Sequence, residues 1–332
     1  MRLGAGPAAG GWNGMARTPA GRTETLRDLA ENLLLRAAIG GALALPRRWR
    51  VPAFGWLVSR TIAPLAGFRE RIRGNLAYVL PDLDAADVAA LCRDVPDNFA
   101  RTLIENYATE ELREIGRRTP LTGPGLEAME EARAAGRPIL LLTGHFGNYE
   151  VPRAALIARG WTVGGLYRPM NNRYFNAHYA ATMHRLGEPV FPRGRTGTAG
   201  FLRHLRGGGA GVLLIDQYFR SGAEIDFLGK PAPTALSAAE IALKIDALLV
   251  PFFGIRQPDG LSFEAVFEAP IPHATAVEMT SAFNAVLEEK VLAHMDQWFW
   301  IHRRWKPERK RARKQPRNAS GPSVSAGAAK SG

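Results

Sequence analysis

The 332-residue chain lacks the residues on which several common kinds of site depend. Its one cysteine, Cys92, excludes an internal disulfide and any metal site built from several cysteines. No two histidines have the spacing of zinc ligands. The chain also has no Gly-x-Ser-x-Gly elbow, which disfavours a serine esterase, and no glycine-rich dinucleotide fingerprint. We therefore expect no metal, no cofactor and no covalent nucleophile.

Long apolar runs are also missing. Segments 30–45 and 51–68 are apolar, but charged residues, among them Glu31 and Arg60, interrupt them. Neither supplies the roughly 20 apolar residues that a spanning helix needs, and no ordered signal peptide precedes them. Arginines and tryptophans around residue 50 favour a helical hairpin or an amphipathic helix at a membrane surface. A helix pair within the protein core is the alternative.

The net positive charge comes from the two ends of the chain. The net charge of +12 divides into +6 for residues 1–60 and +7 for residues 306–332, which leaves −1 for residues 61–305. Basic ends suit an anionic membrane surface, where each basic residue contributes about 1 kcal/mol. A nucleic-acid-binding tail and a solvated, disordered tail are the alternatives. The nearly neutral central segment argues against a nucleic-acid partner.

The most informative stretch covers residues 139–150. The apolar run at 139–142 predicts a short buried strand, and residues 151–159 predict a helix that ends at Gly160. His145 lies in the turn between them. Proteins of the α/β class place reactive groups in such turns, outside the carboxyl ends of their strands.

The spacing of His145 and Glu150 predicts an acid–base pair. If Asn148 caps the helix, the turn brings the Glu150 carboxylate back to the imidazole. A carboxylate on one ring nitrogen fixes the tautomer and leaves the other nitrogen free to act as a general base. A surface pair or a structural histidine is the alternative.

Two more strand ends carry polar side chains. Arg168 follows a predicted strand at 161–167, and Asp216 with Gln217 follows another at 211–215. In a parallel sheet these side chains share an edge with His145. Arg168 can there bind a phosphate or a carboxylate through two parallel hydrogen bonds.

Later segments add structural expectations. Arg193 and Arg195 form either a second anion site or ordinary surface positions. Residues 225–234 predict a loop, and residues 248–267 predict a hairpin that turns at Pro258-Asp-Gly. The tryptophans near the end of the chain, which lie beside arginines, suit either a membrane interface or a cation–π cluster that closes the fold.

His145-x4-Glu150 resembles the His-x4-Asp/Glu motif of the glycerolipid and lipid A acyltransferases. The wider block 143–150 resembles the bacterial late acyltransferases of lipid A biosynthesis, the lauroyl/myristoyl transferase family. Further motifs follow in the order of that family from Asn75 to Lys306. They include Tyr167-Arg-Pro, Asp216-Gln, the segment 225–234 and the C-terminal block 297–306.

This resemblance implies an α/β fold like that of the glycerolipid acyltransferases, with a mixed, mainly parallel sheet flanked by helices and an N-terminal helical membrane anchor. Together with the composition, it predicts four parts of the chain. These are a disordered N-terminus at 1–22, a helical membrane-anchoring segment at 23–70, an acyltransferase domain at 71–305 and a basic disordered tail at 306–332.

The resemblance also implies an activity. The protein would transfer a fatty acyl chain from acyl carrier protein, or from acyl-CoA, to a hydroxyl of a lipid A precursor on the cytoplasmic side of the inner membrane. His145 would be the base and Glu150 its orienting group, with Arg168 and backbone N–H groups near Gly147 holding the oxyanion. The residues assigned to substrate binding are Gly147, Asn148, Arg168, Asp216 and Gln217. Another lysolipid or glycolipid acceptor is the nearest alternative, and a non-enzymatic membrane adaptor is a more distant one.

Overall fold

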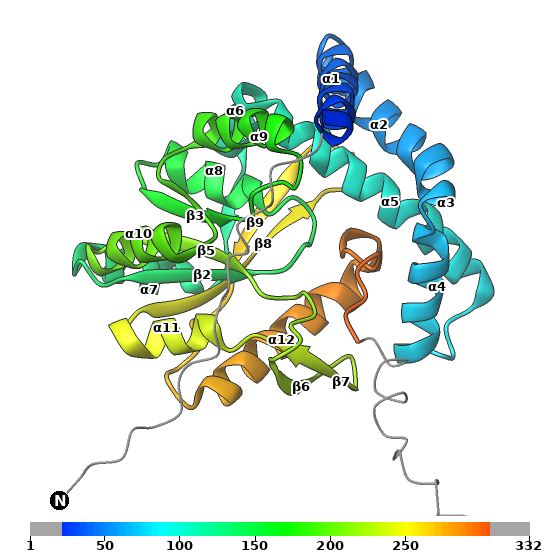
Figure 1. Ribbon diagram of the computed structural model, residues 1–332. Coiled ribbons are helices and arrows are strands. Elements are labelled where there is room, and N and C mark those ends of the chain that lie inside the picture. The colour runs from blue at the N-terminus through cyan, green and yellow to red at the C-terminus, as the bar shows by residue number, and fades with distance from the viewer. Residues whose placement is uncertain (1–21, 306–332) are drawn as a thin grey trace, which may run out of the picture.

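The computed structural model describes residues 22–305, which form an α/β fold around a seven-stranded sheet (Figure 1). The tail at 306–332, and all but the last residue of the N-terminal segment 1–22, lie outside the described residues. The strand order is β1-β9-β8-β2-β5-β3-β4, and every neighbouring pair is parallel except β8 with β9. This confirms the predicted mixed, mainly parallel sheet. The strands are β1 (Leu121–Thr122), β2 (Ile139–Thr143), β3 (Val163–Tyr167), β4 (Val190–Pro192), β5 (Ala210–Leu214), β8 (Leu248–Arg256) and β9 (Phe263–Phe267).

Helices cover both faces of the sheet and extend along one side of it (Figure 1). The N-terminal helices are α1 (Arg22–Leu43), α2 (Arg47–Leu57), the π-helical turn η1 (Val58–Ile62), α3 (Ala63–Leu65), α4 (Phe68–Val79), α5 (Ala85–Tyr107) and α6 (Thr109–Arg118). The others are α7 (Gly125–Ala134), α8 (Glu150–Ala158), α9 (Arg173–Leu186), α10 (Arg195–Arg206), α11 (Ser237–Ile245), α12 (Ala276–Ala293) and the short 3-10 turn η2 (Met295–Gln297).

Strand β2 lies near the middle of the sheet, between β5 and β8, and all five of its residues are buried. Leu140 and Leu142 belong to the core on the side of α10, α11 and α12, whereas Ile139 and Leu141 belong to the core on the side of α7 and α8. The split follows from the alternation of side chains along a strand. Because helices cover both faces, the strand is apolar almost throughout, and this apolar run is what predicted a buried strand from the sequence.

Residues 225–234 form a hairpin, which corrects the predicted loop. Strands β6 (Ala223–Phe227) and β7 (Lys230–Thr234) pair antiparallel across a tight turn at Leu228 and Gly229, both with positive φ. Two prolines in β7 obscured the strand, because proline lowers the expectation of regular pairing. The predicted hairpin of β8 and β9 is confirmed.

Among residues 22–305, no helix combines the length and the apolar character needed to cross a bilayer. The predicted N-terminal membrane anchor is therefore not supported. Helix α2 instead packs on α5, with Val51 and Arg50 buried. The Arg50 guanidinium donates to the Leu45 carbonyl at 2.9 Å and forms an ion pair with Glu111. These polar contacts explain how the charged Arg50, which lies between the two apolar segments, can be buried.

The C-terminal tryptophans close the fold. Trp298, Trp300 and Trp305 are each at most 2% exposed and pack on one another. The Arg304 guanidinium lies 5.5 Å from the ring centroid of Phe227. The block therefore closes the fold, as the second alternative held, although the printed cation–π partner of Arg304 is Phe227 and not a tryptophan. Burial keeps these three tryptophans from a membrane interface.

Candidate functional site

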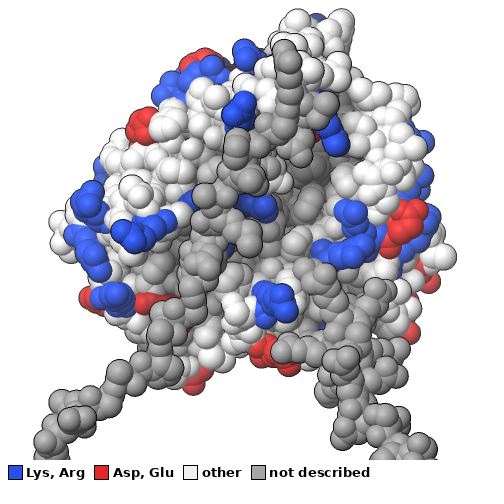
Figure 2. All heavy atoms as spheres, viewed as in Figure 1, with Lys and Arg blue, Asp and Glu red and all other residues white. Residues whose placement is uncertain are grey.

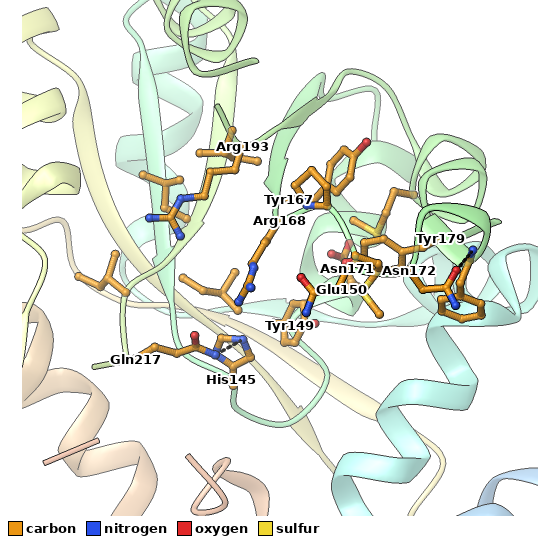
Figure 3. Close-up of a pocket in the computed structure, with 18 of the residues that line it drawn as sticks. His145, Tyr149, Glu150, Tyr167, Arg168, Asn171, Asn172, Tyr179, Arg193 and Gln217 are labelled. Carbon is orange, nitrogen blue, oxygen red and sulfur yellow. Dashed lines mark hydrogen bonds between the residues drawn. The ribbon is translucent and has the colours of Figure 1, made fainter. Parts of the chain in front are cut away.

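Three loops meet at the carboxyl edge of the sheet. Strands β2, β5 and β3 are consecutive and parallel, so the residues that follow Thr143, Leu214 and Tyr167 come together. His145, Arg168 and Gln217 accordingly lie around one pocket (Figure 3). The parallel order therefore delivers the shared edge that the sequence predicted.

His145 is held by Asp216 through two contacts. The ring Nδ1 lies 2.8 Å from Asp216 Oδ1, and the backbone N–H of His145 donates to Oδ2 at 2.7 Å. The indole N–H of Trp298 also donates to Oδ2, at 3.0 Å. A side chain at position 144 would crowd the carboxylate, because a Cβ on Gly144 would lie 2.9 Å from Oδ2. Glycine there permits the close approach of the two strand ends.

The protonation states follow from this pairing. Burial alone would raise the pKa of Asp216, but the charge and hydrogen bonds of His145, together with the charge of Arg304, lower it to about 2. Burial alone would lower the pKa of His145, but Asp216 outweighs it, so the pKa is raised. The ionised Asp216 accepts a hydrogen bond from Nδ1–H, so in the neutral imidazole the basic lone pair lies on Nε2.

Contrary to the prediction, Glu150 does not contact the imidazole. It is the first residue of α8, and its Oε2 lies 3.3 Å from the guanidinium of Arg153, one helical turn onward. Residues three apart face each other on a helix, whereas His145 lies before the helix begins. The His145 partner is Asp216, which the prediction had assigned to substrate binding. Glu150 still lines the pocket.

Gly147 and Asn148 hold the turn together, and their N–H groups are not free for a substrate. The N–H of Gly147 donates to Gln297 O at 2.9 Å, and that of Asn148 to Gly254 O at 3.0 Å. Neither residue lines the pocket. This corrects the substrate contacts predicted for them. Gly147 has a φ of 51°, and a Cβ there would overlap the carbonyl oxygen of Gly254, so only glycine fits.

Helix α5 braces the turn through a buried network that sequence reasoning missed. Arg256 donates to both carboxylate oxygens of Glu105 at 2.8 Å, and Glu105 Oε2 accepts from the Asn148 side chain at 3.1 Å. The Thr102 hydroxyl donates to Gly147 O at 2.9 Å. The sequence offered no clear signal for this network, because Glu105 is one of several charged residues in α5 and its burial follows only from the fold.

The pocket has a volume of about 860 Å³ and opens beside His145. Figure 3 shows Arg168 reaching from the end of β3 toward His145, with Arg193 beyond it. The apolar part of the lining includes Leu166, Met170, Phe175, Met183, Leu213, Leu214, Ile215 and Phe219. A second polar part comes from α1, which contributes Asp28 and Glu31. The pocket thus combines a basic side, an acidic side and an apolar lining.

Gln217 lies beside the second ring nitrogen of His145. Its amide Nε2 lies 3.3 Å from His145 Nε2, as the dashed line in Figure 3 marks. In the described part of the chain, no group of three or more histidine, cysteine or acidic side chains is arranged to hold a metal ion.

Comparison with known proteins agrees with these features. The family model described as "Bacterial lipid A biosynthesis acyltransferase" matches residues 28–307. The chain belongs to this family. The resemblance seen in the sequence is thereby confirmed, and the family description agrees with the acyltransferase activity that it implied.

Individual relatives are more distant. A lipid A biosynthesis acyltransferase of Haemophilus influenzae is 27% identical over 53% of this chain and 56% of its own length. A lipid A biosynthesis lauroyltransferase of Escherichia coli is 28% identical over 55% of this chain and 60% of its own length. A phosphatidylinositol mannoside acyltransferase of Mycobacterium tuberculosis is 23% identical over 76% of this chain and 87% of its own length. The chain thus spans little more than half the length of the two lipid A relatives.

Proposed function

We propose that the protein transfers a fatty acyl chain from an acyl thioester to a hydroxyl of a lipid A precursor. The observation that carries this proposal is the His145–Asp216 pair, with Nε2 facing a pocket that has both arginines and an apolar lining. The family match adds the reaction type.

The proposed reaction uses His145 as the general base. The acceptor hydroxyl loses its proton to Nε2 as its oxygen attacks the thioester carbonyl carbon. Asp216 keeps the other ring proton on Nδ1 and stabilises the imidazolium that forms. When the tetrahedral intermediate collapses, the carbon–sulfur bond breaks and the imidazolium returns the proton to the sulfur. Glu150 contributes to this scheme as part of the pocket wall.

The pocket lining suits both substrates. Arg168 and Arg193 supply bidentate donors for a phosphate on the acceptor or on the pantetheine arm of the donor. The apolar side chains supply a surface for the acyl chain. In Figure 2, Lys and Arg are more prominent than Asp and Glu on the face shown. A basic rim favours an acidic acyl carrier protein as the donor, with acyl-CoA as the alternative.

We also propose that the protein works at the cytoplasmic surface of the inner membrane. Trp49, Trp56 and Leu65 on α2 and α3 are 60%, 59% and 91% exposed, and Leu33 and Leu34 on α1 are 65% and 72% exposed. The surface over α1 and α2 is largely uncharged (Figure 2). Exposed tryptophan and leucine side chains on neighbouring helices suit the headgroup region of a bilayer.

A transfer assay tests the reaction and its base. Acyl carrier protein bearing a labelled acyl chain is incubated with a lipid A precursor and with wild type or His145→Ala. We expect label in the lipid with wild type and at least a thousandfold less with the variant. Parallel reactions with acyl-CoA, a phosphatidylinositol mannoside and a lysophospholipid identify the donor and acceptor. Folded wild type that acylates none of these acceptors would refute the proposal.

Vesicle flotation tests the membrane contact. Wild type should float with vesicles of phosphatidylethanolamine and phosphatidylglycerol. The double variant Trp49→Ala/Trp56→Ala should bind at least tenfold more weakly, because it loses two interfacial anchors. Val277→Ala is the control, since Val277 is also exposed but lies on α12. Equal flotation of all three proteins would exclude this surface as the contact.

A further inference from the structure

Attack on a thioester places negative charge on the carbonyl oxygen. An acyltransferase therefore needs hydrogen-bond donors aimed at that oxygen, and the loss of one such donor typically slows the chemical step by about 100- to 1000-fold. Backbone N–H groups in the turn after a strand are the usual source of these donors.

In this protein the backbone of the turn is already committed. The N–H groups of residues 145 to 148 donate to Asp216 Oδ2, Gly144 O, Gln297 O and Gly254 O, in that order along the chain. In the loop after β5, the N–H of Tyr218 donates to His302 Nε2 at 2.9 Å. These contacts also hold His145 in place, so freeing one of the turn N–H groups would disturb the base itself. None of these five N–H groups is left for a substrate oxygen, so a side chain that lines the pocket is the better source of the oxyanion donor.

Gln217 is the side chain whose amide lies beside the reactive nitrogen. Its Nε2 is 3.3 Å from His145 Nε2, on the pocket side of the imidazole. Its backbone directly follows Asp216, which three hydrogen bonds fix in position. A reacting atom must lie about 3 Å from both the base and the oxyanion donor, and two groups this close to each other meet that requirement.

We propose that Gln217 is a catalytic residue that donates its amide N–H to the thioester oxyanion. This inference rests on the proposed function. In the free protein the amide N–H faces Nε2 of His145. When the acceptor hydroxyl takes its place on Nε2, the amide turns to the carbonyl oxygen. The new carbon–oxygen bond forms, the carbonyl electron pair moves to the oxygen that Gln217 holds, and the hydroxyl proton passes to Nε2. Expulsion of the thiolate, which takes that proton, restores the carbonyl.

The test removes the amide donor in two ways. Gln217→Glu keeps the shape of the side chain, and Gln217→Ala removes the side chain beyond Cβ. Both variants are compared with wild type in single-turnover reactions of labelled acyl carrier protein with the lipid A precursor. We expect both variants to lower the single-turnover rate about 100- to 1000-fold. In steady-state reactions, the KM values for the donor and for the acceptor should stay within about threefold of wild type. In Gln217→Glu the added charge should also raise the pKa of His145 and move the acidic limb of the rate profile to higher pH.

Gln257→Glu is the matched control, because Gln257 lies in the β8–β9 hairpin and donates only to Ile255 O from its side chain. Its rate should stay within twofold of wild type. A rise in KM with an unchanged single-turnover rate would make Gln217 a substrate contact and overturn the proposal. An unchanged rate and unchanged KM would overturn it as well. Absence of transfer by wild type would instead count against the proposed function itself.

Discussion

The pocket has two sides that differ in how firmly they are held. On the inner side, the turn around His145 has its backbone donors bonded, and Asn148, Glu105 and Asp216 are at most 3% exposed. On the outer side, Arg168 and Arg193 are exposed, as is Glu31 of α1. The difference suggests a division of labour. The rigid side preorganises the chemistry, and the more exposed side adapts to the substrate.

If this division holds, the two sides respond differently to substitution. Changes on the inner side should lower kcat and leave KM nearly unchanged, because they alter the reacting geometry. Changes on the outer side should raise KM and spare kcat, because they remove binding that the ground state and transition state share.

The largest expected effect comes from Asp216→Asn. The amide preserves the shape but stabilises the wrong tautomer of His145 and removes the opposite charge, so kcat should fall about 1000- to 10000-fold. The pH profile adds a direction. A base works only when unprotonated, and Asp216 raises the pKa of His145. The acidic limb of kcat should therefore move to lower pH in the variant.

The measurement is kcat against pH for wild type, Asp216→Asn and the control Asp246→Asn. Asp246 is an exposed residue just after α11, so its substitution should leave the profile unchanged. A limb that moves to higher pH in Asp216→Asn would contradict the assigned pairing.

A smaller effect on the same side should follow from Thr102→Val. Valine has the shape of threonine but lacks the hydroxyl that donates to Gly147 O and accepts from Arg256 at 3.2 Å. We expect a loss of about 1–3 kcal/mol in unfolding free energy. We also expect kcat to fall about tenfold because the turn is less well positioned.

Thr102→Ser separates these effects from simple repacking. It restores the hydroxyl with one methyl fewer, so it should recover most of kcat even if its melting temperature stays low. If serine recovers no more activity than valine, the brace through α5 has no part in positioning His145.

The smallest effect should come from the outer side. Arg168→Ala should raise the acceptor or donor KM about tenfold with kcat within threefold, because a bidentate contact to an anion is lost. Arg168→Lys should recover only part of the affinity, since an ammonium group cannot form two parallel hydrogen bonds. Steady-state kinetics with each substrate varied in turn makes the distinction.

Arg195→Ala is the control for this prediction. Arg195 is exposed at the start of α10 and does not line the pocket, so KM should not change. A fall in kcat of more than tenfold in Arg168→Ala would place Arg168 with the inner side and break the comparison.

The sequence predicted those parts of the site that depend on local pattern. The apolar run of β2 located His145, and the strand ends located Arg168, Asp216 and Gln217 near it. The predicted partner of His145 was wrong, because Glu150 is near His145 in the sequence but belongs to a helix that starts after the turn. Asp216 is 71 residues away and becomes adjacent only through the pairing of β2 with β5.

Other features escaped prediction for the same physical reason. Arg256 and Glu105 are 151 residues apart, and no local periodicity relates the end of β8 to a position in α5. The hairpin of β6 and β7 was hidden by its own prolines. Contacts between residues far apart in the chain depend on the strand order and on the whole core. Local patterns in one sequence do not predict them.

The hydrogen bond from Trp298 to Asp216 has a consequence for the order in which the protein becomes active. The carbonyl oxygen of the neighbouring residue, Gln297, accepts a hydrogen bond from the N–H of Gly147. The last described stretch of the chain therefore contacts both Asp216 and the turn that carries His145. A ribosome makes His145 long before it makes these residues. A growing chain would therefore display its histidine motif early, yet gain a competent acid–base pair only once synthesis had passed Trp298.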